Sequence, residues 1–260
     1  MNIIVCIKQI PSSLNNLDLV KNTLNRESGT GETNPYDLHA LETGLRIKEQ
    51  DENGTVIAVS MGVKSVQTLL KEAVALGADR GILLHDKCFA GSDTLATAYT
   101  LSCLVKKIGE YDLIICGKQS LDGATAQVGP ELAEMLNIPH ITNVASIEDI
   151  KENYLVCKKV IQDGLETVKT KLPVLITVGK EINIPRVASL KDIMRAAQTP
   201  IEVYGADDIE ADKKRCGMRG SPTKVTKIHR PIYDTNCRMI QGTLQEQIAA
   251  LTDILIKSTD

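Results

Sequence analysis

Three of the four loops that follow the short apolar runs combine glycine with hydroxyl or amide side chains. The four loops span residues 8–11, 60–62, 89–94 and 117–125, and the last reads GKQSLDGAT. Glycine lets a ligand approach the backbone, helix N-termini offer free N–H groups, and hydroxyls such as Thr94, Thr97, Ser120 and Thr125 can donate to phosphate. The pattern favours a nucleotide or dinucleotide, although each loop taken alone also fits an ordinary turn or helix cap.

The common catalytic and nucleotide-binding motifs are missing. No GxGxxG follows the first apolar run, and the sequence contains no GxxxxGK[ST], GxSxG or HExxH. The seven cysteines are spaced singly, with no CxxC pair and no histidine at metal-ligand spacing. This pattern argues against a disulfide framework or a zinc site and indicates a reducing cytoplasm.

The elements that must position these loops alternate along the chain. Runs at residues 3–7, 56–59, 82–84 and 113–116 are apolar without polar alternation, as in parallel strands buried on both faces. Helices are expected from Asn34, after Ser65 up to Gly77, and after Ser92-Asp93 up to Gly109. Repeated βαβ units predict a doubly wound, mostly parallel α/β sheet with helices on both faces.

The pattern changes beyond residue 140. Residues 154–161 and 165–178 are expected to be extended and joined at Asp163-Gly164, a two-residue hairpin turn. From residue 205 the periodicity weakens into an arm, which ends in an amphipathic helix carrying Leu244, Ile248, Leu251 and Leu255. We therefore expect a nucleotide-binding α/β domain over residues 1–204 and, over 205–260, an arm and helix that dock on a partner subunit.

The net charge of −3 conceals a basic segment. Residues 213–230 contain seven Lys or Arg and no acidic residue, a local charge of +7 that leaves −10 for the rest of the 260-residue chain. A solvated loop, docking on an acidic partner protein and nucleic-acid binding all fit this segment. Aromatic residues make up only 3% of the chain and none lies among these charges, so we expect no nucleic-acid partner.

We also expect no membrane association. The apolar run at residues 3–7 is too short for a signal-peptide core, and the longest uncharged stretch, residues 94–105, is too short to span a bilayer. These features favour a cytoplasmic protein.

Several stretches together resemble one family, the β subunit of electron-transfer flavoprotein. They are VCIKQIP (5–11), NPYD (34–37), VIAVSMG (56–62), ALGADRGILL (75–84), FAGSDTLAT (89–97), GKQSLDGATAQVGPELAEMLNIP (117–139), PRVASLKDIM (185–194) and GSPTKV (220–225). The resemblance covers most of the chain. It implies a heterodimer with an α subunit that transfers electrons through FAD, the group that carries the redox chemistry, so no catalytic side chain is required.

The family contains two kinds of β subunit, one with a structural AMP and one, in electron-bifurcating complexes, with a second FAD. FAGSDTLAT, DGATAQVGP and GSPTKV are similar to the second kind. That kind takes electrons from NADH and passes them through the α-subunit FAD to a partner dehydrogenase and to ferredoxin or flavodoxin. A non-bifurcating, AMP-holding subunit is the alternative, and a stand-alone ATP-binding α/β module is a third hypothesis.

The resemblance also implies the cofactor-binding residues. Thr94 and Thr97 would support the additional flavin phosphate, and the neighbourhood of Phe89 and Gly91 would face the flavin or NADH. Cys6 and Met61 would line the adenine pocket as core residues rather than act as redox groups. Ala124 stands where the family usually has an acidic residue. The remaining implied residues are Asn34, Pro35, Tyr36, Asp37, Gly117, Lys118, Gln119, Ser120, Asp122, Gly123, Thr125, Ala126, Gln127 and Val128.

Leu190 and His39 lie outside the loops that would bind the cofactor. From its residue type, Leu190 would be assigned to the core. Its segment, however, resembles the family's partner-recognition loop. That resemblance implies that Leu190 is an exposed apolar anchor for a dehydrogenase of the acyl-CoA, enoyl-CoA or lactate type. His39, in the first turns of its helix, is expected to be a surface or capping residue.

Overall fold

The computed structural model describes residues 1–12, 19–20, 23–24, 31–51, 53–151, 153–224, 226 and 239–257. The chain divides into two compact units, Met1–Thr226 and Lys227–Asp260. The first unit holds the central sheet. The second contains helix α7 (Leu244–Lys257).

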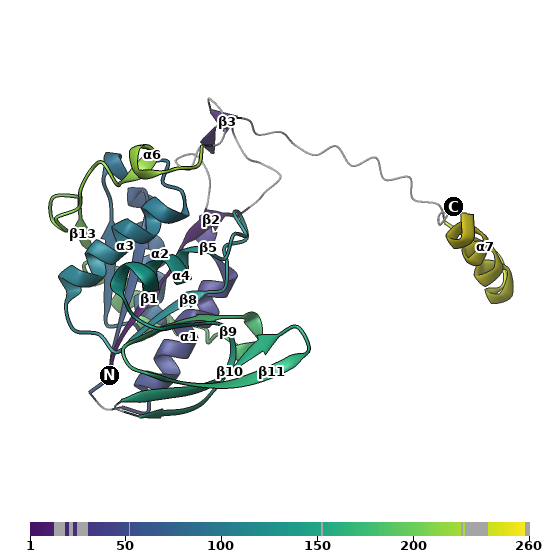
Figure 1. Cartoon of the computed structure of the whole chain (residues 1–260), viewed down its shortest axis with the longest axis horizontal. Helices are drawn as coiled ribbons and strands as arrows, with labels where there is room; N and C mark the ends of the chain where they lie inside the picture. Colours follow the sequence, from purple (N-terminus) through teal and green to yellow (C-terminus); the bar gives the residue numbers. More distant parts are fainter. Residues whose placement is uncertain are drawn as a thin grey trace. The chain divides into compact units, whose positions relative to one another are not determined.

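A nine-stranded sheet runs through the first unit in the order β11-β10-β9-β12-β8-β1-β6-β7-β13 (Figure 1). Its parallel part comprises β9 (His140–Lys151), β12 (Val174–Val178), β8 (Leu113–Gly117), β1 (Asn2–Cys6), β6 (Thr55–Met61), β7 (Arg80–Leu84) and β13 (Glu202–Tyr204). The strand β10 (Tyr154–Ile161) runs antiparallel to β9 and to the edge strand β11 (Gly164–Lys171). The predicted mostly parallel sheet is confirmed.

Helices cover both faces of this sheet. Along β1, Ile3 and Val5 belong to the core beneath α1 (Pro35–Lys48) and α2 (Gln67–Leu76), whereas Ile4 belongs to the core beneath α3 (Thr94–Ile108) and α4 (Val128–Leu136). Side chains alternate between the two faces of a strand, so a strand buried on both sides must be apolar at every position. This arrangement accounts for the uninterrupted apolar runs.

The helix ends follow the predicted signals with one exception. The Asp93 side chain caps α3 by accepting a hydrogen bond from the Ala96 N–H at 3.0 Å, and Gly77 ends α2 with φ of +129°. Ser65 does not cap α2, because it lies inside a 3₁₀ turn (Lys64–Val66) that leads into the helix.

The predicted hairpin forms with its turn one residue earlier than expected. Ile161 pairs with Gly164, so Gln162 and Asp163 make the two-residue turn and Gly164 begins β11. Near the first strand, β2 (Gln9–Pro11) pairs with β5 (Gly31–Thr33), and β3 (Leu19–Val20) pairs with β4 (Thr23–Leu24). Gly29 and Thr30, just before β5, lie outside the described residues.

The first unit extends beyond residue 204, where we expected the arm to begin. Ala206, Ile209 and Cys216 are buried in the core beneath α3, and a short helix, α6 (Gly217–Gly220), follows them. This apolar burial holds the first part of the predicted arm on the α/β body. Within the described residues, no helix is both long and apolar enough to cross a membrane.

Candidate functional site

The strand order reverses at one point of the sheet edge, between β1 and β8, here called the β1–β8 crevice. From β1 the chain continues to β6 and β7 on one side and then returns to β8 on the other side of β1. In open α/β sheets, ligands bind outside the carboxyl ends of the strands at such a reversal. Cys6 and Cys116 lie opposite each other there, as paired residues of β1 and β8.

Asp37, in the first turn of α1, joins the backbones that leave these two strands. Its Oδ2 accepts a hydrogen bond from the Lys8 N–H at 2.8 Å, and its carboxylate also accepts from the Gly117 N–H. A side chain at position 117 would collide with this carboxylate, which explains the glycine. Burial raises the pKa of Asp37 to about 7, although the hydrogen bonds from Asn34, Lys8 and Gly117 oppose the shift.

Asn34 holds the next part of the same loop. Its Nδ2 donates to the Gln119 carbonyl at 2.9 Å, and its Oδ1 accepts from the Leu121 N–H at 3.3 Å. The side chain is buried and makes no capping bond to α1. Asn34 and Asp37 therefore shape the loop after β8 by hydrogen bonds within the protein.

Lys8 is a residue of the site that the sequence did not single out. Its ammonium group lies 2.6 Å from Asp122 Oδ1 and 3.3 Å from Ser120 Oγ, so it ties the end of β1 to the loop after β8. The only feature of the sequence that could have pointed to Lys8 is its position just after a buried strand. Its two partners lie 112 and 114 residues away in the sequence, so no local pattern could predict the contact.

The loop before α4 has an unusual backbone. Ala124 and Ala126 adopt left-handed φ angles of +51° and +55°, and Gln127 follows with right-handed angles of −99° and −33°. Consecutive residues of opposite hand form a concave nest of N–H groups that suits an anion. The α4 N-terminus has no side-chain cap hydrogen bond from Gln127. Residues 123–127 are exposed, so the nest is open to a ligand.

Asp93 brings two distant stretches together at the start of α3. The Ser221 hydroxyl accepts from the Asp93 N–H at 2.8 Å, and Asp93 Oδ2 accepts from the Thr223 N–H at 3.1 Å and from the Thr223 hydroxyl at 2.9 Å. FAGSDTLAT and GSPTKV are therefore neighbours, although about 130 residues separate them.

Thr94 connects the same place to α4. Its hydroxyl lies 3.1 Å from Glu131 Oε1 and 3.4 Å from Gln127 Oε1. Burial raises the pKa of Glu131, as does the neighbouring Asp93, while the bond from Thr94 opposes the shift. Glu131 Oε2 is buried with no hydrogen-bond partner among the described residues, a polar atom that a ligand hydroxyl could satisfy.

The Phe89 ring lies in the core. Its side chain is only 5% exposed and packs in the core beneath α3, because residues 87–89 form a 3₁₀ turn that directs the ring inward. Gly91, with φ of +74°, is exposed and lies against Met218. Of the two, only Gly91 borders the surface.

The residues predicted to bind the cofactor do not all lie together in the structure. Asn34 and Asp37 are bonded to the loop at residues 117–121, and Thr94 contacts Gln127. Met61 ends β6, and both it and Cys6 are half-buried against the core beneath α3. Thr97 and Pro35 are half-buried in the first turns of α3 and α1, and the Tyr36 ring has Lys180 5.0 Å away. The described hydrogen bonds do not join Met61, Phe89 or Thr97 side chains to the β1–β8 crevice.

The first part of the basic segment is held on the body. Lys213 pairs with Asp207 at 2.7 Å, and the Arg215 guanidinium lies 3.9 Å from the Tyr99 ring centroid. Lys227 and Arg230 lie outside the described residues. A freely solvated loop therefore does not describe residues 213–215.

Leu190 is not a core residue. It begins α5 (Leu190–Gln198) and is 74% exposed.

His39 does not cap its helix: it is half-buried, and its Nδ1 lies 3.1 Å from Asn183 Oδ1. Because Asn183 belongs to the segment before α5, His39 connects α1 to that segment.

Comparison with known proteins identifies the family. The electron transfer flavoprotein domain matches residues 21–209. The chain is 42% identical to the electron transfer flavoprotein subunit beta of Thermoanaerobacterium thermosaccharolyticum, over 98% of each chain, and 44% identical to that of Clostridium acetobutylicum, over 87% of each. It is 37% identical to the caffeyl-CoA reductase-Etf complex subunit CarD of Acetobacterium woodii, over 96% of this chain and 95% of the relative.

These matches cover the sheet, the crevice between β1 and β8, and the loops that converge on α3 and α4. The chain belongs to the electron transfer flavoprotein family, and within it to the β subunits that work in electron transfer with an α subunit.

Proposed function

We propose that this chain is the β subunit of an electron-bifurcating electron transfer flavoprotein. It would bind FAD, take electrons from NADH, and pass them through the α-subunit FAD to a partner dehydrogenase and to ferredoxin or flavodoxin. The bound flavin supplies the redox chemistry, and the protein binds and orients it. The observation that supports this proposal best is the junction at Asp93 and Thr94, where all three stretches similar to the bifurcating kind meet.

The diphosphate of FAD fits the loop before α4. The nest at Ala126 and Gln127 and the uncapped first turn of α4 offer N–H groups to an anion. Gly117 makes room for the Asp37 carboxylate that holds this loop, because a side chain at position 117 would collide with it. Lys8 is neutralised by Asp122, so its role is to hold the loop rather than to attract the phosphate.

The surroundings of Thr94 fit a hydroxyl-bearing part of the cofactor better than a second phosphate. Asp93 caps α3 and Glu131 lies beside Thr94, so two carboxylates flank this hydroxyl. Phosphate would face like charge there, whereas a ribityl or ribose hydroxyl could donate to the unpartnered Glu131 Oε2. We therefore place Thr94, and Thr97 one turn of helix from it, next to the hydroxyls of the ligand.

The partner proteins are proposed from separate features. Leu190 and its exposed neighbours would dock on the dehydrogenase, and the relative named as a subunit of a caffeyl-CoA reductase complex favours the enoyl-CoA type. The exposed apolar residues of α7 and the basic segment before it would bind the α subunit.

Counting cofactors tests the proposal. The complex of this chain with its α subunit should release two FAD per heterodimer, and NADH should bleach bound flavin under anaerobic conditions. One FAD with one AMP, and no bleaching by NADH, would instead identify the non-bifurcating alternative. Glu131→Gln, compared with Glu134→Gln on the same helix, should selectively weaken flavin retention because only Glu131 borders Thr94.

A further inference from the structure

The segment before and within α5 exposes an unusual number of apolar side chains. Val187 is 92% exposed, Leu190 74% and Met194 64%. Residues 187–194, here called the docking segment, lie between two attachments to the body. On the C-terminal side, Ala196 is buried against Val74 and Ala75 of α2, and Lys71 donates to the Ala197 carbonyl at 2.7 Å.

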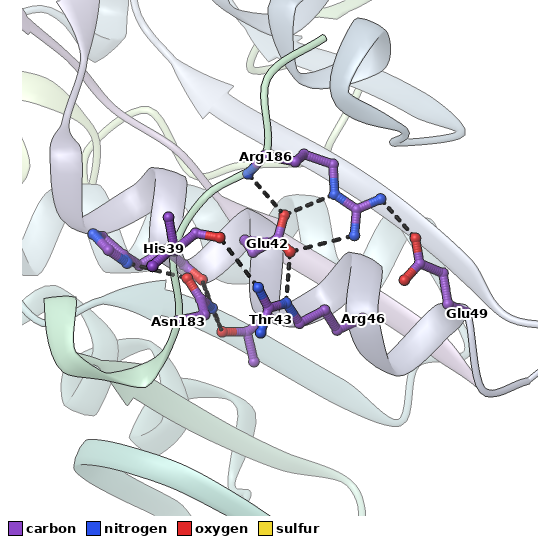
Figure 2. A network of polar contacts seen from close by, with 8 residues as sticks. His39, Glu42, Thr43, Arg46, Glu49, Asn183 and Arg186 are labelled. Carbon is purple, nitrogen blue, oxygen red and sulfur yellow. Dashed lines mark hydrogen bonds and ion pairs between the residues drawn. The ribbon is translucent and has the colours of Figure 1, made fainter.

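The attachment on the N-terminal side is an ion pair between Glu42 and Arg186 (Figure 2). Glu42 Oε2 accepts from Arg186 Nε at 2.7 Å and from the Arg186 backbone N–H at 3.2 Å, and Oε1 accepts from Nη2 at 3.3 Å. The guanidinium extends to Glu49 at 2.6 Å through Nη1. A planar guanidinium that is bound at several of its nitrogens fixes both the position and the orientation of the backbone that carries it.

Neighbouring polar contacts strengthen this attachment. Arg46 donates to Glu42 Oε1 at 2.6 Å and to the Ile184 carbonyl at 3.2 Å. Asn183 Nδ2 donates to the His39 carbonyl at 3.0 Å and lies 2.8 Å from Thr43 Oγ1 (Figure 2). Residues 183–186 are therefore held along α1 by side chains from successive turns of the helix.

Glu42 is suited to hold a charged partner. Its side chain is only 4% exposed, and burial by itself would raise its pKa, but the hydrogen bonds from Arg186 and Arg46 keep the pKa below the ordinary value. The carboxylate is therefore ionised at neutral pH. Loss of Arg186 would still leave it paired with Arg46, so the fold of α1 does not depend on Arg186 alone.

Helix α1 also carries the residues that shape the cofactor loops. Asn34 and Asp37 lie at its N-terminal end, and Glu42 follows Asp37 by five residues, about 7.5 Å along the axis. One rigid helix thus contacts both the loops of the β1–β8 crevice and the base of the docking segment.

We propose that Glu42 and Arg186 are positioning residues for partner docking: their ion pair fixes the docking segment relative to α1, and through α1 relative to the cofactor loops. This inference rests on the proposed docking role of Leu190. Order in the docking segment before binding reduces the entropy lost on association, so the pair would act on the affinity for the dehydrogenase rather than on turnover.

Hydrogen exchange in the complete complex with the α subunit tests the tether. Arg186→Gln should accelerate amide exchange at residues 187–195 by at least about tenfold, because a largely buried ion pair is broken. Arg195→Gln is the matched control: it removes an arginine of α5 that is 64% exposed and pairs at the surface with Asp192. Arg186→Lys keeps the positive charge but lacks the planar guanidinium, so its exchange rate should be intermediate. This variant also keeps the test informative if Arg186→Gln misfolds.

Electron transfer to an enoyl-CoA-reducing dehydrogenase separates this inference from the proposed function. Arg186→Gln should raise KM for that protein several-fold with kcat unchanged, and Arg186→Lys should restore part of the loss. Exchange rates at 187–195 that are equal in Arg186→Gln and Arg195→Gln would overturn the tether. Accelerated exchange with an unchanged KM would overturn the positioning role. A Leu190→Ala variant with normal KM would instead contradict the proposed docking surface, whatever the exchange rates show.

Discussion

The Lys8 ammonium group lies 2.6 Å from Asp122 Oδ1 and joins the end of β1 to the loop that follows β8. The Asp122 side chain is 7% exposed, while that of Lys8 is 39% exposed. A half-exposed lysine at the edge of the sheet is thus paired with a largely buried carboxylate of the proposed diphosphate loop and helps to fix the position of that loop.

Lys8→Gln should weaken binding of FAD, or of AMP if that is the resident nucleotide, by about tenfold. The reason is that a charge-assisted hydrogen bond that orders the loop is replaced by a neutral one, a loss of about 1.4 kcal/mol. Titration of the stripped complex by calorimetry measures the change. Lys64→Gln, in the exposed 3₁₀ turn after β6, is the control and should leave affinity unchanged. Equal affinities for both variants would show that Lys8 does not order the loop.

Ala124→Gly should stabilise the protein by about 0.5–1 kcal/mol. Ala124 adopts φ of +51°, where a Cβ is unfavourable by roughly 1–2 kcal/mol, and the greater flexibility of glycine in the unfolded chain cancels part of that gain. Ala90→Gly offers a comparison, because Ala90 has an ordinary φ of −63° and should lose stability instead. Urea unfolding distinguishes the two, and a loss in both variants would contradict strain at position 124.

Asp37→Asn should change how stability depends on pH. The pKa of Asp37 is about 7 in the folded protein against 3.8 for an ordinary carboxyl, so between these values the folded state holds a proton that the unfolded state has released. The contribution of this group to the free energy of unfolding therefore falls as pH rises from about 4 to 7, by at most about 1.4 kcal/mol per pH unit.

Urea unfolding at pH 5, 6, 7 and 8 measures this effect as the difference between wild type and Asp37→Asn. The free energy of unfolding of the wild type, minus that of the variant, should fall as pH rises and should become constant above pH 7. Asp208→Asn, at an exposed loop carboxylate that accepts from the Gly205 N–H, is the control. A constant difference across the range would mean that Asp37 is ionised throughout.

Ile248→Asp and Leu251→Asp should weaken assembly with the α subunit. Both side chains lie on one stripe of α7 with Leu244 and Leu255, and all four are at least half exposed. Ala249→Asp places the same charge on another side of the helix and serves as the control. Analytical ultracentrifugation of the mixed subunits should show dissociation at higher concentration for the stripe variants only. Unchanged assembly in all three would exclude this face as the contact.

The alternation of apolar runs and periodic helices was sufficient to predict the mostly parallel sheet, because strands buried on both faces leave an uninterrupted apolar signature. The glycine and hydroxyl composition of the loops favours a nucleotide ligand, and this stays a prediction. Phe89 shows what such reasoning leaves open: a 3₁₀ turn places its ring in the core, which its position in a loop does not reveal. Side-chain direction in a loop depends on local dihedral angles that residue type does not reveal.

By itself, the sequence determined the order of strands and helices, the family resemblance and the loops that could bind a nucleotide, since these depend on local patterns and contiguous motifs. Only the tertiary structure decided that β1 and β8 are neighbours, that Lys8 pairs with Asp122, and that Arg186 pairs with Glu42 across 144 residues. Such contacts join charged residues whose types are common on any surface. These contacts form because tertiary packing buries a carboxylate next to a cation, and no local sequence pattern predicts which residues will be brought together.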